Sequence, residues 1–128
     1  MSANEDALRK GYAAFQSGDI PTALGLMAED VVWHVPGNNQ LSGEYVGRDG
    51  VMKFLGQSME LTGGTFRLEV HDILVNDEHG VVLAHVTADR DGKHLEDNSV
   101  QVFHLRDGVV IEQWLQPGSQ AEADAFWA

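Results

Sequence analysis

The chain lacks cysteine and has few basic residues, and both features limit what it does. Without cysteine it forms no disulfide, offers no thiolate to a metal and has no cysteine nucleophile. Eight Lys and Arg residues stand against twenty Asp and Glu residues, which gives a formal net charge of −12. Such a chain repels phosphate backbones and anionic lipids, so we expect neither a nucleic-acid partner nor a membrane partner.

Long hydrophobic runs and cofactor motifs are also missing. No apolar run approaches the ~20 residues that cross a bilayer, and the first six residues are acidic where a secretory signal is basic. We therefore expect a cytoplasmic protein. The spacing of His71, His79, His94 and His104 is unlike that of zinc sites, and no P-loop or dinucleotide fingerprint is present. The sequence thus predicts no metal and no cofactor.

What the chain does contain is enough apolar sequence for one core. It has 128 residues, of which 43% are hydrophobic, so we expect a single domain over residues 1–128 without repeats or linkers. Helical spacing of apolar residues predicts helices over 4–15 and 50–61, and a short helix from Asp19 to about Met27. Asp19 and Asp49 are the expected N-caps of the second and third helices.

The remaining sequence favours strands. Residues 31–35 are β-branched and aromatic and are followed by Pro36-Gly37, which predicts a short strand and a turn. From residue 65 onward the period is two, which predicts strands over 65–75, 80–90, 93–105 and 109–116 with short turns and antiparallel neighbours. The alanine-rich segment 119–128 is expected to form a short helix that covers one end of the sheet.

The order of these elements and three short motifs together are typical of a known superfamily. The motifs are Met27-Ala28-Glu29-Asp30 before the first strand, the Gly-x-x-x-Gly-Arg-Asp-Gly pattern at residues 43–50, and Asp107-Gly108 before the last strand. The chain resembles SnoaL-like members of the nuclear transport factor 2 and ketosteroid isomerase superfamily. The resemblance implies an α+β fold, a conical, curved antiparallel sheet closed by three N-terminal helices, also described as a cystatin-like barrel. It also implies an apolar cavity and a homodimer joined through the outer sheet face.

The same resemblance implies that the familiar catalytic groups of the superfamily are absent. The aspartate base of ketosteroid isomerases would fall near Val35. The Arg and Asp residues of limonene epoxide hydrolases would fall at His85, Thr87 and Leu115. SnoaL-type cyclases often end in Gly-Lys-Ile-x-Glu-His-Trp, and this chain has Gln113 in place of the histidine.

Strand alternation points instead to a neutral polar cluster. Leu83, His85 and Thr87 share one face of their strand, and we expect that face to line the cavity. Gln101 shares a face with Phe103, and Gln113 with Leu115, so both amides are expected to meet His85. Histidine titrates near neutrality, which makes His85 the acid–base candidate. The alternative is that His85 is a hydrogen-bonded, partly buried strand residue.

Other candidates come from the helices and strand ends. Trp33 and Val35 share a face and are expected to line the cavity, together with Phe54 and Met59 of the third helix. The hydroxyl of Tyr12 could stabilise an oxyanion, and Asp97 could be held protonated to donate a hydrogen bond. Core packing is the alternative for Tyr12 and Trp33, and a solvated strand end is the alternative for Asp97.

These residues predict a protein that binds a small, mostly apolar, oxygenated molecule, with cofactor-independent acid–base catalysis of the isomerase, cyclase or hydrolase kind. The competing hypothesis is a non-catalytic ligand carrier or a protein-interaction dimer. An enclosed pocket in which a ligand reaches His85 favours an enzyme or a carrier, and a collapsed core with an exposed apolar sheet face favours interaction.

Overall fold

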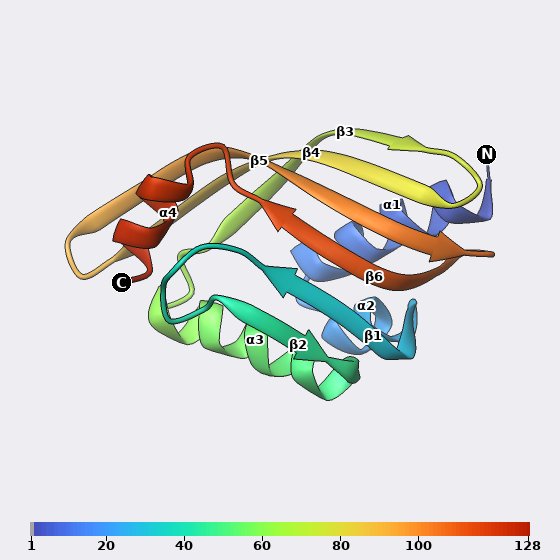
Figure 1. The fold of residues 1–128 in the computed structure, drawn as a ribbon, viewed down its shortest axis with the longest axis horizontal. Coiled ribbons are helices and arrows are strands. Elements are labelled where there is room, and N and C mark those ends of the chain that lie inside the picture. The colour runs from blue at the N-terminus through green and yellow to red at the C-terminus, as the bar shows by residue number, and fades with distance from the viewer. Residues whose placement is uncertain (1) are drawn as a thin grey trace.

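A curved sheet with helices packed against its concave side forms the body of the molecule (Figure 1). The computed structural model describes residues 2–128. Helices α1 (Ala3–Gln16) and α2 (Ile20–Gly25) precede strands β1 (Met27–Val35) and β2 (Gly43–Val46) and helix α3 (Gly47–Leu61). Strands β3 (Arg67–Val75), β4 (His79–Arg90), β5 (Lys93–Arg106) and β6 (Val109–Gln116) and helix α4 (Gln120–Phe126) complete the chain.

The six strands follow the order β2-β1-β6-β5-β4-β3. Four neighbouring pairs are antiparallel, whereas β1 and β6 run parallel. The predicted α+β class with a curved sheet covered by helices is therefore confirmed. Within the described residues the sheet does not close on itself, because β2 and β3 are its edges, and the parallel pair makes it a mixed sheet rather than an antiparallel one.

The second half of the chain follows the sequence prediction closely, because its turns are strongly encoded. Asp91 and Gly92 both have positive φ angles, 51° and 76°, and Asp107 and Gly108 have 50° and 81°. Asp-Gly in this conformation makes a two-residue hairpin turn whose twist matches that of the strands it joins. The Asp91-Gly92 turn fixes the register of β5 against β4 along the whole pair, whereas the register of β5 against β6 shifts once, between His104 and Leu105.

The first half departs from the prediction in three places. The second helix ends at Gly25, and β1 already starts at Met27; segment 43–46 pairs with β1 as an extra strand; and α3 begins at Gly47. The prediction that Asp49 caps this helix is wrong, since Val46 is its N-cap residue and makes no side-chain bond. Instead, the Arg48 guanidinium donates two hydrogen bonds, at 3.1 and 2.7 Å, to the Met27 carbonyl and ties the start of α3 to β1.

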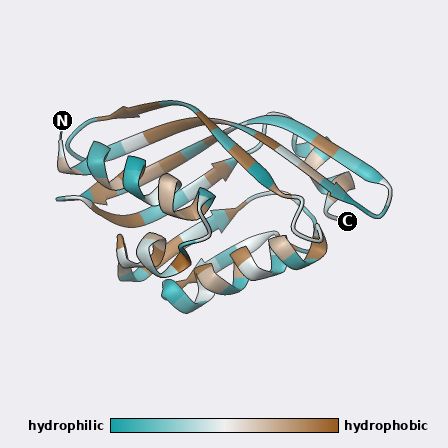
Figure 2. Cartoon of the chain, turned by 180° about the vertical axis from the view of Figure 1, so that it is seen from behind, coloured by the Kyte–Doolittle hydropathy of each residue, from teal (hydrophilic) through white to brown (hydrophobic). Residues whose placement is uncertain are grey.

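Hydrophobic and hydrophilic residues alternate along the strands (Figure 2). On β4 the buried residues are Gly80, Val82, Ala84, Val86 and Ala88, and the residues between them are half-buried or exposed. Helices α1 and α3 cover the buried face, α1 packing on β3, β4 and β6 and α3 on β1 and β2. The concave face of the sheet and the helices therefore enclose the core.

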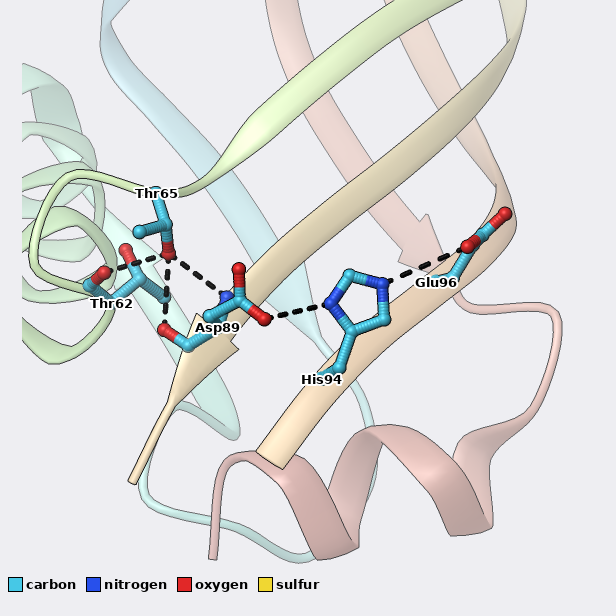
Figure 3. A network of polar contacts seen from close by, with 5 residues as sticks. All are labelled: Thr62, Thr65, Asp89, His94 and Glu96. Atoms are coloured by element: carbon cyan, nitrogen blue, oxygen red, sulfur yellow. Dashed lines mark hydrogen bonds and ion pairs between the residues drawn. The ribbon is translucent and has the colours of Figure 1, made fainter. Parts of the chain in front are cut away.

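Where α3 leads into β3, polar contacts tie that connection to the β4–β5 hairpin (Figure 3). The Thr65 hydroxyl accepts a hydrogen bond from the backbone N–H of Asp89 at 2.9 Å and lies 2.7 Å from the Thr62 carbonyl oxygen. The Asp89 carboxylate lies 2.7 Å from His94 Nδ1, and His94 Nε2 lies 3.7 Å from Glu96. The hydrogen bond to Asp89 is the main cause that raises the pKa of His94 above its usual 6.5, and Glu96 adds to it.

We expect Asp89→Asn to shift the titration of His94 to lower pH, back toward 6.5. Because the folded-state pKa is raised, this contact stabilises the fold fully below about pH 6.5, and the contribution is lost as the pH rises through the folded-state value. The measurement is a pH titration of the imidazole NMR signals. Asp91→Asn is the control, because it removes an equal charge from the same hairpin without touching His94. An equal shift in both variants would mean that general charge, not this hydrogen bond, sets the pKa.

Candidate functional site

A cavity lies between the concave face of the sheet and helices α1, α3 and α4. Its volume is about 190 Å³, and its walls are mostly hydrophobic side chains. An engineered apolar cavity of ~150 Å³ accepts benzene. The space is therefore sufficient for a compound built on about one six-membered ring.

Nine of the predicted site residues line this cavity. They come from α1, α3 and the inner faces of β1, β5 and β6, so segments far apart in the sequence meet here. They are Tyr12, Trp33, Val35, Phe54, Asp97, Gln101, Phe103, Gln113 and Leu115.

His85 and Thr87 were predicted to line the cavity, and this placement is wrong. Alternation grouped the residues of β4 correctly, but the face that turns inward is that of Val82, Ala84 and Val86, against which α1 packs. The His85 side chain is 37% exposed on the outer face, where Nδ1 lies 2.8 Å from Asn98 and Nε2 lies 3.4 Å from Glu96. It therefore meets neither Gln101 nor Gln113.

Met59 is the third residue whose placement was predicted wrongly. It is 38% exposed, whereas Ser58 beside it is buried and lines the cavity. The Ser58 hydroxyl donates to the Phe54 carbonyl at 2.9 Å, so a polar side chain sits in the buried stripe of α3 at little cost. The prediction placed Met59 in the cavity because it is more apolar than Ser58. In the structure Ser58 is the one of the two that lies on the buried face of α3.

Tyr12 joins α1 to the floor of the cavity. Its hydroxyl donates a hydrogen bond to Gln101 Oε1, and its ring meets the Phe103 ring edge-on at 6.2 Å. Burial raises the pKa of the Tyr12 phenol well above its usual 10, so the group remains a neutral donor at physiological pH. Tyr12 and Gln101 therefore both line the cavity.

Trp33 and Gln113 lie side by side on the inner face. They are register partners in the parallel pair of β1 and β6, and they are 8% and 3% exposed. The indole ring packs on Phe54 with ring centroids 5.8 Å apart. Trp33 Nε1 and Gln113 Oε1 are both buried, and neither has a hydrogen-bond partner among the residues that the structure describes.

Asp97 is the one charged side chain among the described residues of the cavity wall. It is half-buried, and one carboxylate oxygen accepts a hydrogen bond of 2.9 Å from the Gly118 backbone N–H. The neighbours Glu96 and Asn98 are exposed on the opposite face. Asp97 therefore matches neither of the two predictions, a solvated strand end or an acid enclosed in the cavity. It is a carboxylate at the border of the cavity.

Helix α4 forms in the segment where the sequence predicted a helix over one end of the sheet; it packs on β5, and Ala123 and the following Trp127 lie in the cavity wall. Asp124 fastens this helix to the segment after β1, because its Oδ1 accepts hydrogen bonds from the Asn39 side chain at 2.8 Å and from the Asn38 backbone N–H at 3.0 Å. These two bonds lower the pKa of Asp124. The helix and the segment therefore close that end together.

Sequence reasoning missed several wall residues. Ser99 is among them, although it shares the inner face of β5 with Gln101, and alternation alone could have found it. Phe15 is another, although its helical spacing with Tyr12 puts it on the same face of α1. Phe66, just before β3, and Leu68 in β3 carried no comparable signal. Their place in the wall depends on how α1 packs across β3.

His34 lies on the outer face of β1. Its ring stacks on Trp114 with centroids 5.3 Å apart, and its Nε2 lies 2.5 Å from Glu112. No cluster of three or more His, Asp or Glu side chains within residues 2–128 is arranged to hold a metal ion. Among the described helices, none is both long enough and apolar enough to span a bilayer.

Known proteins share this arrangement over nearly the whole chain. Bal32a, from a soil-derived mobile gene cassette, is 33% identical with a TM-score of 0.93, and the match covers 98% of this chain and 97% of Bal32a. A Xanthomonas campestris protein of unknown function with a cystatin-like fold is 30% identical with a TM-score of 0.92, covering 100% and 99% of the two chains. The uncharacterised protein Rv0034 of Mycobacterium tuberculosis is 29% identical over 127 residues, 98% of this chain and 97% of that protein.

The family model of the SnoaL-like domain matches residues 8–113, a span that runs from α1 to Gln113 on β6 and includes most of the cavity wall. The resemblance drawn from the sequence is thereby confirmed, and the chain belongs to the SnoaL-like domain family.

Proposed function

We propose that the chain binds a small, mostly apolar, oxygenated molecule in the cavity described above. The observation that carries the proposal is the cavity itself, about 190 Å³ of space with hydrophobic walls, an indole N–H on β1 and a few amide and hydroxyl groups on β5, β6 and α1. Ligand sites have this composition, since apolar walls supply affinity and a few polar groups fix orientation.

The first test is a thermal-shift screen with terpenoid epoxides, steroids, polyketide-like aromatics and small hydroxy acids. A ligand that binds only the folded protein raises Tm, and we expect ring-sized neutral compounds to do so. Leu115→Trp, which adds bulk on the inner face, is expected to abolish the shift. Val109→Trp is the control outside the cavity wall, at a turn position that is 40% exposed, and it should respond as the wild type does. If no compound raises Tm, the proposal fails.

We further propose that a ligand in this cavity undergoes acid–base chemistry without a cofactor, with Asp97 as the proton-transfer group. The carboxylate takes a proton from one position of the ligand and returns it at another, so an isomerisation or ring closure balances without a second reactant. For the Tyr12 hydroxyl to stabilise negative charge on a ligand oxygen, it turns from Gln101 Oε1, which it contacts in the empty cavity, to the ligand. His85 has no part in this step because it lies on the other face.

Asp97→Asn tests this step on any compound found in the screen. We expect turnover to fall by about 10²-fold or more, the usual contribution of a general acid–base group, while Kd changes little. Glu96→Gln is the control. The Glu96 carboxylate is next to Asp97 in the sequence but lies on the opposite face of β5, so its removal should leave turnover unchanged. Product formation is followed by NMR. Binding without turnover by the wild type would instead identify a ligand carrier.

A homodimer through the outer face is the second proposal. One row of register partners crosses four strands there, Leu74 to Val81, Val81 to Val102 and Val102 to Trp114. The side chains of this row are apolar and only half-buried or exposed. A continuous apolar row on a sheet face favours burial against a second copy of the same face.

We expect light scattering on the wild-type protein, as it elutes from a size-exclusion column, to give twice the chain mass of 14.0 kDa. Val102→Glu places two like charges near each other across a two-fold interface and should give the single-chain mass. Val109→Glu adds the same charge at a 40% exposed hairpin position outside the row and should leave the dimer intact. A monomeric wild type would contradict the proposal.

A further inference from the structure

Three buried polar atoms of the cavity wall have no partner among the described residues, namely Trp33 Nε1, Ser99 Oγ and Gln113 Oε1. Buried polar atoms are almost always hydrogen-bonded, so each such atom requires an explanation. All three belong to side chains that line one cavity. The wall therefore presents unused hydrogen-bonding capacity to whatever occupies it.

Trp33 and Gln113 are a complementary pair. The indole N–H only donates, and the amide oxygen only accepts. Both side chains are more than nine-tenths buried, and they are register partners on adjacent strands. A ligand group that satisfies both atoms at this place must accept one hydrogen bond and donate another. A hydroxyl does so with one oxygen, whereas a ketone, an ether or a carboxylate only accepts.

The other groups of the wall restrict the charge of the ligand. Asp97 is the one charged residue among the described lining residues, and it is negative. A carboxylate or phosphate ligand would leave water for an apolar space with no cationic partner, which costs much free energy. The acceptor oxygen of Gln101 is already bonded to Tyr12. The site suited to a neutral hydroxyl is therefore the pair of Trp33 and Gln113.

We propose that the cavity selects neutral phenols or alcohols of about one ring, whose hydroxyl oxygen accepts from Trp33 Nε1 and donates to Gln113 Oε1. The ring of the ligand then lies against the apolar wall that Phe54 and Phe103 help to form. This inference rests on the proposed ligand-binding function and names the chemical class of the ligand.

The test uses calorimetry with four probes that share one skeleton: 4-isopropylphenol, its methyl ether, p-cymene and 4-isopropylbenzoate. For the wild type we expect the phenol to bind more tightly than the ether, the ether more tightly than p-cymene, and the benzoate not to bind. Each step corresponds to one hydrogen bond, about three- to tenfold in Kd. Equal Kd values for the phenol and p-cymene would overturn the inference while leaving the binding function intact. If none of the probes binds, both fail.

Two variants separate the two hydrogen bonds. Gln113→Leu removes the acceptor and should weaken only the phenol, so that phenol and ether bind alike. Trp33→Phe removes the donor and should weaken the phenol and the ether relative to p-cymene. Gln57→Leu, an amide on α3 outside the cavity wall, is the control and should keep the wild-type order. An unchanged preference for the phenol in Gln113→Leu would contradict the proposal.

A second measurement on the wild type keeps the test decisive if a cavity variant fails to fold. The indole N–H signal of Trp33, assigned by comparison with Trp114→Phe and Trp127→Phe, should move downfield with the phenol and the ether and not with p-cymene. If Trp33 and Gln113 instead bond each other in solution, the signal will not discriminate among the probes, and the proposal is wrong.

Discussion

The parallel pairing of β1 with β6 is the contact on which the cavity depends. It joins the N-terminal half, which carries β1, β2 and the three first helices, to the antiparallel strands of the C-terminal half. The pairing is non-local, so loop-closure entropy opposes it, and the burial of the inner face has to offset that cost. Its register places Trp33 beside Gln113. The indole N–H of Trp33 and the amide oxygen of Gln113, which have no partner among the described residues, therefore lie on adjacent strands of the wall.

The pleat of the sheet gives the molecule two different surfaces, the inner face that lines the cavity and the outer face that carries the apolar row. Because successive side chains point to opposite faces, each strand contributes to the cavity and to the outer row at the same time. On β5, Gln101 and Phe103 face the cavity, whereas Val102 between them belongs to the outer row. A slip of one residue between β4 and β5 would exchange the two sets, so the Asp91-Gly92 turn that fixes this register preserves both the cavity wall and the outer row.

The predictions that succeeded rest on local signals. Alternation grouped Gln101 with Phe103 and Gln113 with Leu115, and the Asp-Gly dipeptides located both turns. The errors at His85 and Met59 have a different origin. Alternation states which residues share a face, but it does not state which face the helices cover. A buried serine that bonds its own helix, as Ser58 does, likewise leaves no mark in hydrophobic periodicity.

The sequence by itself determined most of the elements, the family and the residues that share each strand face, because turn chemistry and side-chain period act over a few residues. Only the tertiary structure decided that the face of Val82, Ala84 and Val86 turns inward, since that depends on where α1 packs. It also decided that β1 lies beside β6, which places Trp33 against a residue eighty positions away on the chain. Such pairings depend on burial summed over the whole sheet, and no local pattern in the sequence encodes that sum.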